Sequence, residues 1–144
     1  MTKEEIAIKY FRDGFNCSQA VFTTFSESLG LDTESSLKLS CGFGAGMGRL
    51  QDTCGAVTGA YMTLGLKYGK FKKEDDPARE KTYSLVQEFD AKFKQKYNTT
   101  SCKNLLNCDL MTEEGHNFFK NNNLREKTCE NCIKDAVSIV EKMI

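Results

Sequence analysis

The chain has 144 residues, and its 20 basic and 20 acidic side chains give a formal net charge of zero. This length is typical of one domain with a single core, and the neutral balance creates no field that would attract nucleic acid or an anionic membrane. No apolar run approaches the roughly 20 residues that a membrane-spanning helix requires.

The first thirty residues predict two helices. Thr2 and Glu5 have the spacing of a capping box, and the helix that follows them is expected to stop at Gly14. Asn16 is placed to cap a second helix, "CSQAVFTTFSESLG", which Gly30 should end.

The next segment predicts a short helix and then a break. Asp32 or Thr33 opens the helix, which runs through Cys41, and "GFGAGMG" interrupts it because alternating glycines resist a helix and permit positive φ. The order of these glycines matches neither phosphate-binding fingerprint. We therefore expect a tight loop whose backbone lies against Cys54 or Cys41, with a small-ligand loop as the alternative.

Two further helices are indicated in the middle of the chain. One spans about 53–68 and stops at Gly69, and Pro77 suits the first turn of a long amphipathic helix over 77–97. In that long helix we expect four side chains to face the core: Tyr83, Val86, Phe89 and Phe93.

The remaining sequence predicts short helical pieces around 101–106 and 112–119, and a last helix over 128–144. No segment shows strand alternation with hairpin turns. The sequence therefore predicts one all-α domain over residues 1–144, a bundle of about five main helices with short helical pieces.

Seven cysteines are many for a chain of this length. The first residues, "MTKEEIAIKY", are charged and do not read as a signal peptide, so we expect a cytoplasmic protein. In a reducing compartment, structural disulfides are disfavoured, and redox chemistry or metal ligation explains the cysteines better than packing alone.

Four of the cysteines, Cys17, Cys54, Cys102 and Cys129, fall in the first turn of an expected helix. Unpaired amides and the helix dipole stabilise a thiolate at such a position, which suits a redox cysteine or a metal ligand. Cys54 is the strongest candidate, since the helix after it carries small residues at Gly55 and Gly59, where another backbone, in this chain or in a homodimer, can approach.

The remaining cysteines and the single histidine carry weaker signals. Cys132 forms a Cys-x-x-Cys pair with Cys129, which suits either a disulfide or two metal ligands, and the absence of a following histidine argues against covalent haem. Cys41 and Cys108 lie at a helix end and in a loop, and His116 is expected to face solvent.

These segments together resemble a known family. "NCSQAVFTTF", "CGFGAGMGRLQDTCGAVTGAYMTLGLKYG", "SCKNLL" and "CENCIKDAVSIVEKM" are similar to the C_GCAxxG_C_C family, whose label proposes a redox role. The resemblance implies four recurrent cysteines, carried here by Cys17, Cys54, Cys102 and Cys129, with Cys132 as an alternative for the last. Similar domains also occur beside cytochrome modules with an iron centre.

Three functions remain open from the sequence. The leading hypothesis is thiol–disulfide redox chemistry or electron transfer with a partner protein, in which Cys54 is a low-pKa attacking thiolate resolved by Cys17, Cys102, Cys129 or Cys132. The alternative is an iron–sulfur cluster or zinc held by Cys17, Cys54, Cys102 and Cys129. The third is a helical structural or oligomerisation module.

Overall fold

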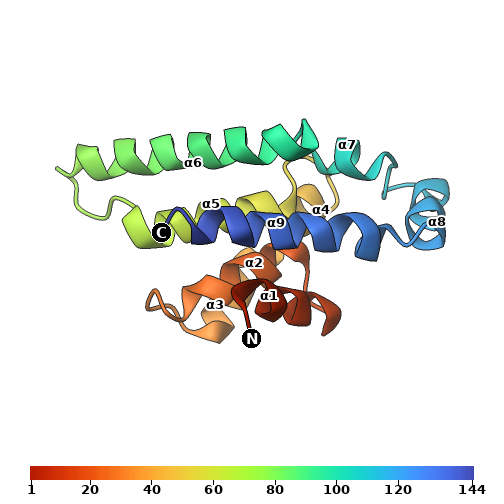
Figure 1. Ribbon diagram of the computed structural model, residues 1–144, viewed down its shortest axis with the longest axis horizontal. Coiled ribbons are helices and arrows are strands. Elements are labelled where there is room, and N and C mark those ends of the chain that lie inside the picture. Colours follow the sequence, from red (N-terminus) through yellow and green to blue (C-terminus); the bar gives the residue numbers. More distant parts are fainter.

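The computed structural model describes all 144 residues and is built from helices without a β-strand, which confirms the all-α prediction (Figure 1). In chain order the helices are α1 (Lys3–Arg12), α2 (Cys17–Ser26), α3 (Thr33–Cys41), α4 (Gly44–Met47), α5 (Gly55–Tyr68), α6 (Asp76–Tyr97), α7 (Cys102–Leu106), α8 (Glu113–Asn121) and α9 (Glu130–Glu141). A single π-helical turn, η1 (Arg125–Cys129), leads directly into α9.

The helices form three layers (Figure 1). Helix α6 lies on one side, α5 and α9 lie beside each other in the middle, and α1, α2 and α3 cover the other side. Helices α7 and α8 extend one end of this arrangement beyond the end of α6. No helix is both long enough and apolar enough to cross a membrane.

Most helix starts follow the signals in the sequence. Thr2 and Glu5 form the predicted capping box, and Asn16 forms a second one with Gln19 at the start of α2. Asp32 caps α3, and Pro77 lies in the first turn of α6 as expected. These caps satisfy amide groups that would otherwise lack partners, so they fix where each helix begins.

One cluster of buried side chains from α1, α2, α5, α6 and α9 forms the core. Phe89 and Phe93 are fully buried, which confirms their predicted orientation, and Val86 is partly buried. The prediction for Tyr83 is wrong, because its side chain is 55% exposed. Its position lies on the solvent side of α6.

A bidentate ion pair ties the first helix to the last. The Arg12 guanidinium donates to both carboxylate oxygens of Glu130, at 3.1 and 2.8 Å, and Glu130 is only 5% exposed. Two parallel N–H···O bonds hold a carboxylate in a defined orientation. This contact fixes the start of α9, which carries Cys132, against α1.

The small residues of α5 are used within the chain. A side-chain carbon at Gly59 would lie 2.9 Å from the Ser18 carbonyl oxygen and 3.0 Å from Val21, so only glycine lets α2 pack this closely. The expectation of a close backbone approach is therefore confirmed, and the approaching element is α2 of the same chain. This face of α5 is not free for a second copy of the chain.

Candidate functional site

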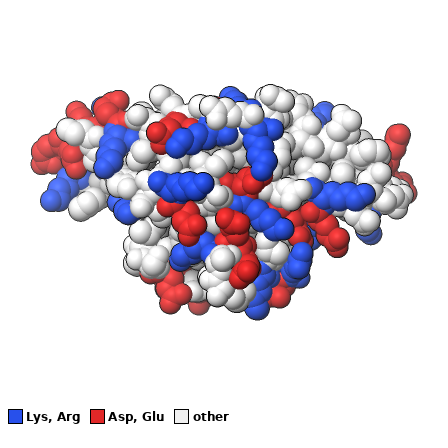
Figure 2. Space-filling model, viewed as in Figure 1, with Lys and Arg blue, Asp and Glu red and all other residues white.

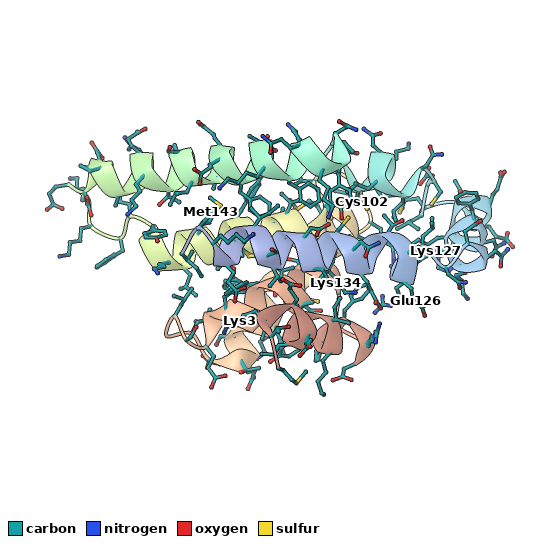
Figure 3. The ribbon with its side chains drawn as sticks, in the orientation of Figure 1. Lys3, Cys102, Glu126, Lys127, Lys134 and Met143 are labelled. Atoms are coloured by element: carbon teal, nitrogen blue, oxygen red, sulfur yellow. The ribbon has the colours of Figure 1, made fainter.

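Five cysteines from four different segments line a single cavity of about 110 Å³. The cavity lies where the starts of α2, α5, α7 and α9 meet, close to Cys102 in Figure 3. Eleven of its 15 lining residues are hydrophobic. All five candidate cysteines, Cys17, Cys54, Cys102, Cys129 and Cys132, thus lie around one small and mostly apolar space.

A short antiparallel contact places Cys54 beside Cys102. Thr53 and Ser101 form an isolated β-bridge, in which the Cys54 amide donates to the Thr100 carbonyl and the Cys102 amide donates to the Asp52 carbonyl, both at 2.7 Å. Cys54 immediately precedes the first residue of α5, and Cys102 is the first residue of α7. The bridge brings these two helix starts together although they are far apart in the sequence.

The glycine-rich segment forms an unusual left-handed turn. Residues 45–49 all have positive φ, including the non-glycine residues Ala45 (54°), Met47 (71°) and Arg49 (69°). Left-handed backbone costs an L-residue roughly 1–2 kcal/mol, so such a run persists only where the surroundings enforce it. The expected tight loop is present, but it is a continuous left-handed turn and not only a break between two helices.

This turn lies against the cavity cysteines. The Ala45 backbone hydrogen-bonds to the Cys17 thiol, and a side-chain carbon at Gly46 would lie 2.7 Å from the Cys102 Cβ atom. The loop backbone therefore lies against Cys17 and Cys102, where the sequence suggested Cys54 or Cys41. Gln51 holds the end of the turn by bonding to the Cys108 carbonyl and to the Leu110 amide.

The glycine that follows Cys54 makes room for another sulfur. A side-chain carbon at Gly55 would lie 2.4 Å from Cys17 Sγ, closer than any van der Waals contact allows. Gly55 thereby lets the Cys17 thiol approach the start of α5. Glycine is needed directly after Cys54 because the Cys17 sulfur packs against the backbone at this position.

Cys54 is the central thiol of the group. The hydrogen bond with the Cys132 thiol, together with burial, raises the pKa of Cys54 well above its usual range, although the hydrogen bond with the Cys17 thiol lowers it. The hydrogen bond with Cys54, and burial, likewise raise the pKa of Cys17. Amides at the helix starts, from Ala56 and Ser18, act in the opposite direction, as the sequence predicts, but they are outweighed. The prediction that Cys54 has a low pKa is therefore wrong for the fully reduced protein.

Cys102 and Cys129 also favour the protonated state. Burial raises the pKa of each thiol to about 12, and the nearby Cys17 adds to this effect at both. Two groups oppose the shift: the Gln51 side chain at Cys102 and the Arg125 guanidinium at Cys129. Cys129 is therefore the cavity cysteine with a cationic side chain beside it.

Cys129 does not begin a helix, contrary to the prediction. The preceding turn η1 is already helical, and Cys129 itself has helical backbone angles (φ −63°, ψ −43°). The Cys129 amide is therefore not one of the unpaired amides found at a helix start. π-Helical turns are rare and often occur at functional sites, and this one aims Arg125 and Cys129 at the same cavity.

Arg125 is a site residue that the sequence analysis missed. Its guanidinium donates to the Phe11 carbonyl at 2.6 Å and stacks on the Phe11 ring, with its central carbon 3.8 Å from the ring centroid. These contacts fix the cation at the cavity wall. Arg125 stands in a polar stretch, "NNNLREK", which carries no pattern that distinguishes it from solvent-exposed charge.

A tyrosine lies on the other side of Cys132. The Tyr97 hydroxyl donates a hydrogen bond to Asp135 and contacts the Cys132 thiol. Burial is the main cause that raises the pKa of Tyr97, and the hydrogen bond with Asp135 is the next. Lys96 pairs with Asp135 at 2.9 Å. Cys132 and Asp135 are three residues apart on α9, which places them on one helix face.

Two cysteines and the histidine lie apart from the cavity. Cys41 is exposed, Cys108 is partly exposed, and neither lines the cavity. His116 is exposed on α8, which confirms that it faces solvent. None of these three residues lines the cavity.

The fit of a metal to this site is mixed. Thiolates are the ligands that zinc and iron–sulfur clusters prefer, so the residue types are suitable. Yet no group of three or more His, Cys, Asp or Glu side chains is arranged to hold a metal ion. Three of the thiols, those of Cys17, Cys54 and Cys132, are instead linked by hydrogen bonds to one another.

A family model matches residues 15–143, and its description reads "Putative redox-active protein (C_GCAxxG_C_C)". The chain belongs to the C_GCAxxG_C_C family. The match includes every cysteine of the chain, so the family resemblance seen in the sequence is confirmed. No curated protein and no solved structure matches the chain significantly.

Proposed function

We propose that the protein carries electrons by cycling pairs of its cavity cysteines between thiols and a disulfide, in exchange with a redox partner in the cytoplasm. The observation that carries this proposal is the contact of the Cys54 thiol with both Cys17 and Cys132. Thiols that already touch need little movement to bond. The family description, which names a redox role, supports the same conclusion.

The overall reaction is balanced by a disulfide from the partner. Two cavity thiols lose two hydrogens and two electrons and form one S–S bond, while the partner's R–S–S–R gains them and becomes two R–SH. The reverse reaction returns the electrons. No further cofactor is needed for this exchange.

Exposure indicates which sulfur reacts first. Cys17, Cys54, Cys102 and Cys132 are 9%, 8%, 7% and 1% exposed, whereas Cys129 is partly exposed. Cys129 also has Arg125 beside it, which partly offsets the effect of burial on the pKa of this thiol. We therefore assign the first attack to Cys129, and the storage of the disulfide to the buried sulfurs around Cys54.

The neighbouring Cys132 is placed to resolve the first product. Cys129 and Cys132 are three residues apart in helical backbone, so they lie on one face, close enough for a disulfide. Attack by the Cys132 thiolate on the Cys129 sulfur of a Cys129–S–S–R mixed disulfide forms the Cys129–Cys132 disulfide and releases the second R–S⁻. Exchange with Cys54 then moves the bond into the buried group.

The test is to oxidise reduced protein with the cyclic disulfide of dithiothreitol, alkylate the remaining thiols, and map the products by mass spectrometry. We expect the wild type to lose about 2 Da per disulfide, with Cys54 bonded to Cys17 or Cys132. Cys54→Ser removes both bonds, while Cys41→Ser, at an exposed cysteine outside the cavity, is the matched control. Full alkylation of all cavity cysteines after oxidation would contradict the proposal.

A second candidate function uses the same sulfurs as ligands of an iron–sulfur cluster or zinc. The clustering of five thiols around one cavity favours it, with Cys17, Cys54, Cys102 and Cys129 as the set proposed from the sequence. A native mass spectrum of protein purified without oxygen separates the two candidates. Added mass that matches a cluster or zinc supports ligation, and the bare sequence mass supports thiol chemistry.

A further inference from the structure

A polar groove of about 620 Å³ lies next to the thiol cavity. The end of α6 and α7 form one wall, and η1 with α9 forms the other; its polar lining includes Lys96, Asn104, Lys127, Asn131, Lys134 and Asp135. Leu105 and Thr128 line both the groove and the cavity. A molecule in the groove is therefore separated from the sulfurs by a single layer of side chains.

The groove carries an excess of positive charge. Lys96 is paired with Asp135, but neither Lys127 nor Lys134 forms an ion pair with a carboxylate. The two free lysines lie along one helical segment (Figure 3), and Figure 2 shows basic side chains across this face with acidic ones between them. A chain with no net charge thus has two unpaired cations beside its thiols.

The same helical face supplies hydrogen-bond donors. Asn131 lies four residues after Lys127 and three before Lys134, which places the three side chains on one stripe. Asn104 faces them from α7. Cations and amides on both walls suit a ligand with carboxylate, sulfonate or phosphate oxygens.

The size of the two spaces favours a small reaction partner. The cavity of about 110 Å³ is too small to admit part of another protein, and its sulfurs are largely covered. The groove volume falls within the range of about 300–1,000 Å³ that small-molecule sites occupy. Cys129 lines the cavity and directly follows Thr128, which lines both spaces, so a small molecule in the groove lies one residue away from this sulfur.

We propose that this groove binds anionic low-molecular-weight disulfides and thiols, and that these are the redox partners of the cavity cysteines. The inference rests on the proposed thiol function and names its substrate class. Lys127 and Lys134 attract the anionic group, and the ligand disulfide then lies beside Cys129. Attack by the Cys129 thiolate on R–S–S–R forms Cys129–S–S–R and releases R–S⁻, and attack by the Cys132 thiolate on the Cys129 sulfur then forms the Cys129–Cys132 disulfide and releases the second R–S⁻.

Three disulfides of one carbon skeleton test the charge preference. They are cystamine, bis(2-hydroxyethyl) disulfide and 2,2′-dithiodiethanesulfonate, which carry positive, neutral and negative ends. The rate of intramolecular disulfide formation is followed by acid quench and mass spectrometry. Each rate is divided by the rate of the same reagent with a short cysteine peptide, which removes intrinsic reactivity.

We expect the corrected rate for the sulfonate to exceed that for the neutral reagent by on the order of tenfold at low salt, and the preference to shrink as salt rises. In Lys127→Gln/Lys134→Gln the ratio should fall towards one. Lys127→Arg/Lys134→Arg should retain it, because the charge is kept. Lys73→Gln/Lys120→Gln removes two exposed charges that do not line the groove and is the matched control.

The outcomes separate this inference from the function on which it rests. Equal corrected rates for the three reagents would overturn the groove as a binding site and leave the thiol function standing. An equal loss of preference in the Lys73/Lys120 control would assign the effect to overall charge and would also overturn it. If no reagent forms a disulfide among the cavity cysteines, the proposed function fails, and the groove inference fails with it.

Discussion

The two ends of the helical stack formed by α5, α6 and α9 are built on different principles. At the end that contains the C-terminus, Leu64, Val137 and Val140 are fully buried within regular helices (Figure 1). At the other end, the same three helices meet a left-handed turn, a π-helical turn and five thiols. The regular end has apolar side chains and no cavity cysteine, while the irregular end contains every candidate redox residue.

This difference indicates how stability and chemistry are divided. Burial of close-packed side chains stabilises the regular helices. This stability offsets the cost of a strained backbone at the other end. The strained segments then place sulfurs where regular helices could not, as Ala45 does for Cys17 and η1 does for Cys129. The regular end supports the irregular one.

The largest expected effect follows from breaking the packing that supports the site. Phe93 is fully buried and stacks on Phe89 and Tyr97, with centroid distances of 6.1 and 4.7 Å. Phe93→Ala should lower the free energy of unfolding by about 3–5 kcal/mol, measured by urea denaturation. Phe71→Ala, at a ring that is 87% exposed, is the control and should change it by less than about 0.5 kcal/mol. Equal losses in the two variants would contradict the division proposed here.

The irregular end should make the protein sensitive to alkaline pH. The pKa of Cys102 and of Cys129 is about 12 in the folded chain, against about 8.5 for an unfolded cysteine. Between these values the unfolded chain loses protons that the folded chain keeps. The stabilisation of the protonated thiols is therefore fully present below about pH 8.5 and falls as the pH rises towards 12.

Each of these two thiols contributes at most about 1.4 kcal/mol per pH unit in that window. Urea denaturation of the reduced protein between pH 8 and pH 10 measures the slope. Cys102→Ser/Cys129→Ser should flatten it, whereas Cys41→Ser, at an exposed cysteine, should not. A wild-type slope equal to that of the double variant would show that burial of these thiols does not control the alkaline limit.

The same division decided which features could be predicted from the sequence. The regular helices follow from local signals, such as the Thr2–Glu5 capping box and Pro77 in the first turn of α6. Cysteine placement at the starts of α2, α5 and α7 could be predicted for the same reason. Convergence of these starts on one cavity depends on the packing of distant segments, and local signals support only the expectation that helix ends can meet.

Other features of the site arise from tertiary contacts. The Thr53–Ser101 bridge joins segments about fifty residues apart and leaves no period-two pattern to detect. The raised pKa of Cys54 depends on the sulfurs that surround it, which local helix-start rules cannot include. Arg125 enters the site through a π-helical turn, and no simple sequence pattern predicts such a turn.

The smallest effect compares two glycines of one helix. Gly55 lies at the irregular end of α5, where an added side-chain carbon would lie 2.4 Å from Cys17 Sγ. Gly55→Ala must displace that sulfur and should cost about 1–3 kcal/mol of unfolding free energy. The displaced sulfur should also form a disulfide with Cys54 more slowly, as read by quenched alkylation and mass spectrometry.

Gly65 is the matched control, since it lies in the same helix towards the regular end and an added carbon there meets no atom within 4 Å. Gly65→Ala should stabilise the protein by roughly 0.5–1 kcal/mol, because alanine restricts the unfolded chain and favours helix. Its disulfide formation should match that of the wild type. If Gly55→Ala behaved like Gly65→Ala in both measurements, the close contact of Cys17 with the start of α5 would not shape the site. If Gly55→Ala lowers the unfolding free energy and Gly65→Ala raises it, the requirement for glycine is confined to the cysteine end of α5.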